Sequence, residues 1–103
     1  MNRGDVYSID WPRAGRHPAV VITRQGAIPY LRNVTVALVT TTIRGLPTEV
    51  ALGTAEGLSR DSVVNCDNVL TVPKEELDSY RGRLGPQAVE HLNRSLAIAL
   101  GLD

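Results

Sequence analysis

The sequence predicts a mainly β fold, a small curved antiparallel sheet or β-barrel with a C-terminal helix. Three observations predict it. Short runs of β-branched and apolar residues recur between Asp5 and Val72, Gly and Pro residues separate these runs, and one amphipathic repeat occupies the C-terminal end. Many short strands followed by a single helix are typical of a sheet that curls around its core and is covered by that helix.

The first two strands are predicted on either side of a tight turn. Asp5–Asp10 alternates, with Tyr7 and Ile9 on one side of the pleat, and the turn-prone stretch WPRAG follows it. Pro18–Thr23 (PAVVIT) is continuously apolar and β-branched, which is typical of a strand covered on both faces. We therefore expect a central strand here, with Pro18 confined to its first position.

The middle of the chain predicts a loop and two further strands. Arg24–Asn33 contains Gly and Pro breakers, so we expect a loop with at most a turn of helix. Val34–Thr42 (VTVALVTTT) favours a strand. Thr48–Leu52 alternates, which predicts a strand with its apolar residues facing inward and Glu49 facing outward.

Two more short strands are predicted around a polar step, and a helix closes the chain. The strands are Ser62–Asn65 and Asn68–Val72, and Lys74–Asp78 has room for no more than one helical turn. Gly85 and Pro86 stand where a helix cap and first position belong, and Gly101 stands where the helix ends. Between them runs an apolar stripe of Val89, Leu92, Leu96 and Leu100, while Ile98 lies off the stripe and is available to a partner subunit.

Length and composition limit the function classes. At 103 residues we expect one domain, residues 1–103, with one modest core. A lone cysteine, Cys66, excludes an internal disulfide, and the charges in residues 1–15 exclude the apolar core of a signal peptide. No apolar run reaches membrane-spanning length. We therefore expect a cytoplasmic protein without membrane contact.

Charge is segregated along the chain. Met1–Arg44 holds six arginines against two acidic residues, a net +4, and Gly45–Asp103 is −4. Ten of the eleven basic residues are arginines, whose forked guanidinium suits phosphate and stacks on bases. A fold that gathers the first half on one face would offer a basic surface to a polyanion, although the arginine excess is equally explained by genome composition.

Three polar clusters stand at strand ends and carry the candidate chemistry. Neither a nucleotide-binding glycine motif nor a metal-ligand spacing is present, so no cofactor and no metal are expected. The clusters are Arg13, Arg16 and His17 before the central strand; Thr40, Thr41 and Thr42 after the next; and Asn65, Cys66 and Asp67 between the last two. Trp11 either stacks on bases or belongs to the core.

The order of these features along the chain resembles the MazF/PemK (Kid) family of toxin endoribonucleases. The matching stretches are RGDVY, GxHPAVVI, VALVTT, LxRDSVVNCD and RLGP, in register over nearly the whole chain. The resemblance implies an SH3-like barrel of the CcdB/PemK type, a homodimer, and a cognate antitoxin whose disordered tail occupies the RNA groove. It also implies metal-independent cleavage of single-stranded or loop RNA, whether mRNA, tRNA or rRNA.

The resemblance assigns site residues unevenly. The family's arginine before the second-strand proline falls on His17, so Arg16 is one residue out of place, while the family's hydroxyl falls on Thr40. Where some members have Arg-Cys-Asp, this chain has Asn65-Cys66-Asp67. The loop from Trp11 to Arg16, which helps the family to select RNA, is shorter here.

The predicted mechanism is attack of the RNA 2′-hydroxyl on the adjacent phosphate, leaving 2′,3′-cyclic phosphate and 5′-hydroxyl ends. Arg16 would stabilise the phosphorane charge, Thr40 would hold a non-bridging oxygen, and His17 or Asp67 would transfer protons. The predicted RNA-binding residues are Arg13, Trp11, Thr41, Thr42, Arg44 and Asn65. Two alternatives stay open: a non-catalytic poison of DNA gyrase with the same fold, and an inactive homologue kept for antitoxin binding.

Overall fold

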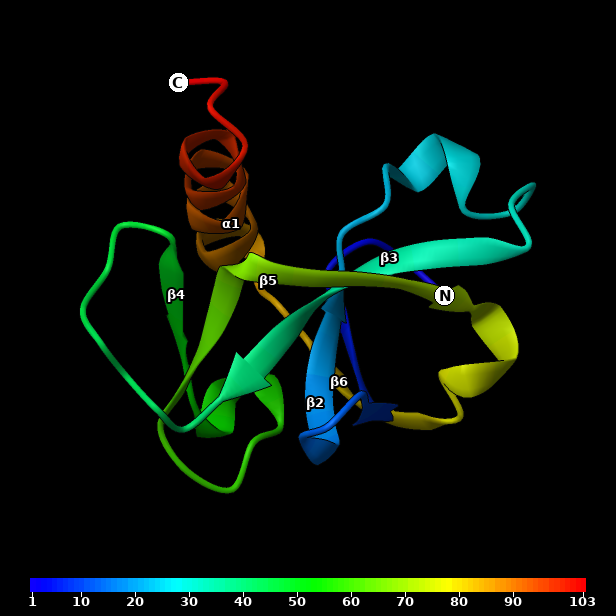
Figure 1. Cartoon of the computed structure of the whole chain (residues 1–103), viewed down its shortest axis with the longest axis horizontal. Coiled ribbons are helices and arrows are strands. Elements are labelled where there is room, and N and C mark those ends of the chain that lie inside the picture. The colour runs from blue at the N-terminus through cyan, green and yellow to red at the C-terminus, as the bar shows by residue number, and fades with distance from the viewer.

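One curled six-stranded sheet and one helix form the molecule, and the computed structural model describes all of residues 1–103 (Figure 1). All neighbouring strands are antiparallel, in the order β4-β5-β3-β2-β1-β6. This confirms the predicted mainly β architecture. The elements are β1 Asp5–Trp11, β2 Gly15–Val21, β3 Asn33–Thr40, β4 Glu49–Leu52, β5 Ser62–Pro73, β6 Ser79–Arg83 and α1 Pro86–Ala99, with 3-10 turns η1 Gln25–Ala27, η2 Thr54–Glu56 and η3 Lys74–Glu76.

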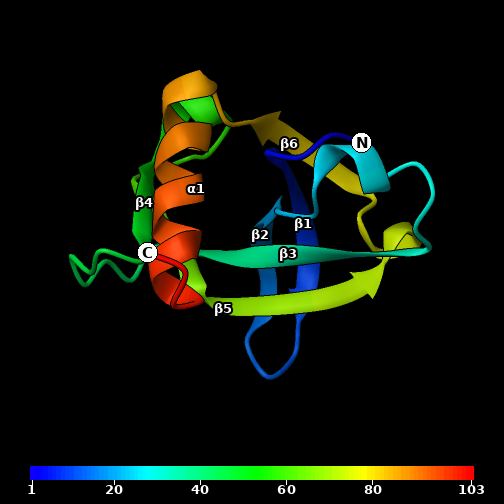
Figure 2. The same ribbon diagram turned by 90° about the horizontal axis from the view of Figure 1, so that it is seen from above.

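The sheet has a buried cluster on each face. On one face Val20 packs with Val39, Val64 and Leu92 of α1. On the other, Ala19 and Val21 pack with Ile9, Trp11, Val36 and Leu77. Figure 2 shows α1 standing against β4 at one side of the curl. The prediction of a central strand covered on both faces is therefore confirmed for β2.

β2 begins earlier than predicted, at Gly15, so Arg16 and His17 are strand residues. Pro18 lies inside the strand and not at its first position, which corrects that prediction. The sheet tolerates it because Pro18 pairs with Ser8 of β1, whereas pairing with β3 starts only at Ala19. Successive strand residues point to opposite faces, so Arg16 and His17 diverge.

β5 is one bent strand and not two. Its register against β3 jumps from Ala37 opposite Val69 to Leu38 opposite Asn65, so residues 66–68 form a bulge. Asp67 lies in this bulge and Cys66 beside it is buried. β6 was not predicted at all, because its sequence SYRGR has no apolar alternation.

Glu49 faces inward, which contradicts the predicted outward orientation. Its side chain is 7% exposed, and its carboxylate accepts hydrogen bonds from three backbone N–H groups of the preceding loop. These backbone donors satisfy the carboxylate inside the protein, so Glu49 can be buried at a position where the sequence alternation predicted a solvent-facing residue. β3 ends at Thr40, so Thr41 and Thr42 belong to the loop and not to the strand.

The C-terminal helix begins and ends as predicted. Gly85 is its N-cap, Pro86 its first residue, and Gly101 has a φ of +72°, the left-handed conformation that favours glycine. Leu92 and Leu96 of the stripe are buried, but Leu100 follows the helix and is exposed. No helix in the structure combines the length and the apolar character needed to cross a membrane.

Candidate functional site

A pocket of about 230 Å³ lies where β2 begins and β3 ends. Its walls come from β2, β3 and the start of the loop after it, the segment before β5, and β6. They contain two arginines, one histidine and four hydroxyl side chains, and no carboxylate; the lining residues are His17, Pro18, Val39, Thr40, Thr41, Leu58, Ser59, Arg60, Ser62 and Arg81. Basic groups and hydroxyl donors without a competing acid are suited to a phosphate.

His17 and Thr40 meet in this pocket because of the strand register. Ala19 pairs with Leu38, and two residues further along each antiparallel strand His17 stands level with Thr40. The His17 ring lies between two backbone carbonyls, with Nδ1 3.3 Å from Val39 O and Nε2 3.0 Å from Ala14 O. A neutral imidazole can donate to only one of them, whereas the protonated ring donates to both. Thr40 Oγ1 accepts a hydrogen bond of 3.2 Å from the Thr42 N–H.

Arg81 and Arg60 are pocket residues that the sequence reasoning missed. Arg81 Nη1 donates to Ser8 Oγ at 2.9 Å, and Ser8 is itself buried in β1. Neither arginine is in an ion pair, since both salt bridges of the protein involve Arg16. The LxRDS stretch contained a signal for Arg60, but Arg81 required recognition of β6 and of its pairing with β1.

Arg16 does not line the pocket. Its guanidinium turns toward the β1–β6 edge, where Nη2 lies 3.1 Å from Asp78 Oδ1 and donates to Ser79 Oγ at 3.3 Å, and Nη1 lies 3.6 Å from Asp10 Oδ1. Two carboxylates therefore hold the guanidinium that sequence reasoning assigned to the phosphate. The structure brings together His17 and Thr40, with Arg16 outside their pocket.

Asp67 and Asn65 also lie outside the pocket lining. Asp67 Oδ2 accepts a hydrogen bond of 2.6 Å from Thr48 Oγ1, and the Asp67 N–H donates to Asn65 Oδ1 at 3.0 Å. These contacts connect the β5 bulge to the start of β4. Asp67 is thus engaged by a hydroxyl in a different part of the sheet from His17.

The other predicted RNA-binding residues are spread over two loops. Trp11 is 8% exposed and belongs to a core cluster, so its predicted stacking on bases is corrected to core packing. Arg13 lies at the exposed tip of the β1–β2 hairpin with a φ of +63°. Thr41 lines the pocket, and Thr42 and Arg44 are exposed on the loop that follows.

Cys66 is not a nucleophile candidate. Burial, followed by the charge of Asp67, raises the pKa of its thiol to about 11. A thiol with this pKa stays protonated at neutral pH, and the thiolate is the reactive form. No group of three or more His, Cys, Asp or Glu side chains is placed to hold a metal ion.

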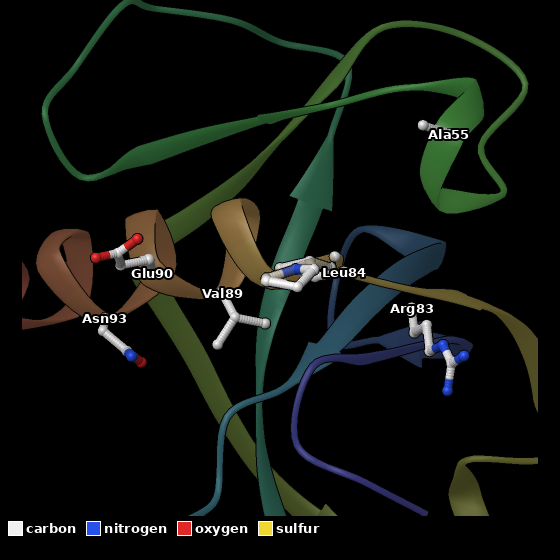
Figure 3. A pocket seen from close by; sticks show the side chains of 8 residues that line it. Ala55, Arg83, Leu84, Val89, Glu90 and Asn93 are labelled. Atoms are coloured by element: carbon white, nitrogen blue, oxygen red, sulfur yellow. The ribbon is translucent and has the colours of Figure 1, made fainter.

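A larger hollow of about 870 Å³ lies elsewhere, between β6, η2 and the first turns of α1. Figure 3 shows Arg83 on one side of Leu84 and Val89, with Glu90 and Asn93 on the other. Its polar groups do not converge, and Glu90 brings a carboxylate. We therefore take the smaller pocket as the candidate site, because a catalytic site needs several functional groups directed at one point, and volume alone does not provide them.

Comparison with known proteins agrees with the fold. The sequence profile described as "PemK-like, MazF-like toxin of type II toxin-antitoxin system" matches residues 2–100. The chain belongs to the PemK/MazF toxin family. Endoribonuclease MazF3 of Mycobacterium tuberculosis is 42% identical over 86 residues, 84% of each chain. Probable endoribonuclease MazF5 of the same species is 39% identical over 99 residues, 95% of this chain and 91% of that protein.

Solved structures of PemK/MazF toxins have the same fold. Mycobacterium tuberculosis toxin MazF-mt6 superposes with a TM-score of 0.88 at 36% identity, covering 96% of this chain and 98% of that one. A mycobacterial endoribonuclease in complex with its cognate antitoxin has a TM-score of 0.89 at 35% identity, covering 100% and 97%. The predicted family resemblance is confirmed.

Proposed function

We propose that this protein is the endoribonuclease toxin of a type II toxin-antitoxin system, cutting single-stranded or loop RNA without a metal in the bacterial cytoplasm. The single observation that carries the proposal is the carboxylate-free pocket of arginines, histidine and hydroxyls at the strand ends. Support comes from the relatives, which are named as endoribonucleases, one of them in complex with its cognate antitoxin.

The pocket residues divide the reaction between them. The 2′-hydroxyl of the RNA attacks the adjacent phosphorus and loses its proton, the bond from phosphorus to the 5′-oxygen breaks, and that oxygen gains a proton. Arg81 and Arg60 stabilise the charge that develops on the phosphorane oxygens, and the Thr40 hydroxyl donates to a non-bridging oxygen. His17 moves protons, for which its ring must release one of its two carbonyl contacts.

Arg81 takes the part that the sequence assigned to Arg16. Arg81 lies in the pocket without a carboxylate partner, whereas Arg16 would first have to leave Asp78 and Asp10. The ion pairs of Arg16 are exposed and weak, so the main difference is position: Arg81 lies in the pocket with one hydroxyl partner and can donate to a phosphate there. The partners we propose are RNA, a cognate antitoxin and a second copy of the chain in a homodimer.

Incubation of the purified protein with total RNA, with and without EDTA, tests the proposal. We expect cleavage that survives chelation and leaves 5′-hydroxyl ends. A substrate with one 2′-deoxy substitution at the cleavage position must remain uncut there, because the attacking group is missing. Cleavage of that substrate, or loss of activity in EDTA, would overturn the mechanism. An intact RNA pool together with inhibition of DNA gyrase would favour the non-catalytic alternative.

A further inference from the structure

The loop between β3 and β4, residues 41–48, combines exposure with firm attachment. Every residue from 41 to 47 is exposed, and the loop projects from one side of the body in Figures 1 and 2. It starts at Thr41, which lines the candidate pocket, and carries Thr42 and Arg44. Thr41 is the one residue of the loop that lines the pocket, and the rest of the loop extends away from it.

Glu49 holds the middle of this loop. Its carboxylate accepts hydrogen bonds from the backbone N–H groups of Arg44 at 3.0 Å, Gly45 at 2.9 Å and Leu46 at 3.3 Å, all to Oε1. The Glu49 N–H donates in return to Leu46 O at 3.0 Å. Glu49 is in no ion pair and is 7% exposed, so the loop amides are what stabilise its buried charge.

The end of the loop is held by two other elements. Thr48 Oγ1 donates to Asp67 Oδ2 at 2.6 Å, and Thr48 O accepts from the Cys66 N–H at 3.0 Å. Ser95 of α1 is 1% exposed, and its hydroxyl donates to Pro47 O at 3.0 Å. The β5 bulge and the helix therefore fix the same segment.

We propose that Glu49 and Asp67 are positioning residues that hold the 41–48 loop in one conformation, so that it continues the RNA-binding surface from Thr41 at the edge of the pocket. Asp67 acts through Thr48 and is not a proton-transfer group. The effect of the loop on RNA rests on the proposed function, but its attachment does not. A fixed loop conformation matters because a small displacement of a group at the reacting centre lowers the reaction rate.

Hydrogen exchange of the full chain tests the attachment without any need for activity. In wild-type protein the amides of Gly45 and Leu46 should be protected. In E49A they should exchange at least about tenfold faster, the effect of losing one hydrogen bond, while amides in β3 and β5 stay unchanged. E49Q keeps one carbonyl acceptor and should lie between the two, and it serves if E49A fails to fold. Unchanged protection in both variants would overturn the proposal.

Three substitutions separate positioning from proton transfer at the Asp67–Thr48 pair. D67A and T48V should each raise KM for RNA by up to about tenfold, and the double variant should lose no more than the worse single variant. D67N retains an acceptor for Thr48 Oγ1 and should recover most of the activity lost in D67A. The pH profile of kcat should be the same in all of them.

A proton-transfer role for Asp67 gives the opposite pattern. D67N would then be as inactive as D67A, with kcat down by roughly 10² to 10⁴-fold and one limb of the pH profile missing. T48V would be mild. That result overturns the inference and leaves the proposed function standing. A wild-type protein that cuts no RNA would instead refute the proposed function, with hydrogen exchange still deciding the attachment.

Discussion

At the residue scale, one position along β2 decides which basic group reaches the pocket. Arg16 and His17 are neighbours, but alternation sends their side chains to opposite faces. Arg16 meets Asp10 and Asp78, and His17 meets Thr40 across the register. Arg16, chosen from the sequence, does not line the pocket, whereas Arg81 of β6, a strand that was not predicted, does.

Replacing single arginines tests this assignment. Arg81→Ala should lower kcat for RNA cleavage by roughly 10² to 10³-fold, the usual effect of removing one donor to a developing oxyanion. Arg16→Ala should lose far less, since its side chain does not line the pocket. Arg83→Ala, on the same strand but lining the other hollow, is the matched control for charge. A severe loss in Arg16→Ala with normal activity in Arg81→Ala would contradict the assignment.

The buried thiol makes stability depend on alkaline pH. Burial raises the Cys66 pKa from 9.0 to about 11, so the unfolded chain releases this proton first. The thiol's contribution is complete below pH 9 and is lost as pH rises toward 11. Urea unfolding at several pH values should show stability falling through this range, with a shallower fall in Cys66→Ala. Equal slopes in the two proteins would show that the thiol is not responsible.

At the element scale, the position of β6 depends on close contact between its backbone and the backbone at the end of η2. A side chain on Gly82 would begin 2.5 Å from the Glu56 carbonyl oxygen, and one on Gly57 would begin 2.1 Å from Arg81 O. Both contacts are backbone against backbone, so neither side can yield by a rotamer change. This approach of η2 to β6 fixes the strand that carries Arg81.

Gly82→Ala tests that approach. Overpacking against a rigid backbone costs typically about 1–3 kcal/mol, so the free energy of unfolding in urea should fall by that amount. Cleavage should also fall in the variant at temperatures where it remains folded, because Arg81 is displaced. Gly26→Ala is the control, since nothing lies within 4 Å of the added carbon and its φ is not in the left-handed region. Equal stability of the two variants would refute the packing argument.

At the scale of the whole molecule, zero net charge conceals a locally basic site. The protein has eleven basic and eleven acidic residues, yet no acid lines the pocket. Asp10 and Asp78 pair with Arg16, Glu49 accepts from loop amides, and Asp61, between the pocket residues Arg60 and Ser62, lines a different hollow. The field at the pocket therefore differs from what the overall balance suggests.

RNA binding should consequently depend on salt despite the neutral composition. Each phosphate contact to single-stranded RNA contributes about −0.7 to the slope of log K against log salt concentration. Binding of a 2′-deoxy-substituted, uncleavable RNA at several salt concentrations measures this slope. Arg81→Ala should reduce its magnitude by about 0.7 if the guanidinium contacts a phosphate. An unchanged slope in that variant would place Arg81 away from the RNA backbone.

The sequence by itself determined the local elements and the family. Alternation and β-branched runs located β1 to β4 and the two halves of β5, and Gly85, Pro86 and Gly101 marked the helix ends, because these signals depend on neighbours along the chain. Thr40 and His17 could be found the same way, as polar residues at strand ends.

Only the tertiary structure decided which groups share the pocket. Its walls come from separate segments of chain, and their meeting depends on the β2–β3 register, the β5 bulge and the pairing of β6 with β1. The burial of Trp11 is likewise settled by partners distant in sequence, whereas Glu49 turns inward to backbone amides only three to five residues before it. Packing and pairing between strands outweigh the local pattern, because they join residues that are far apart along the chain.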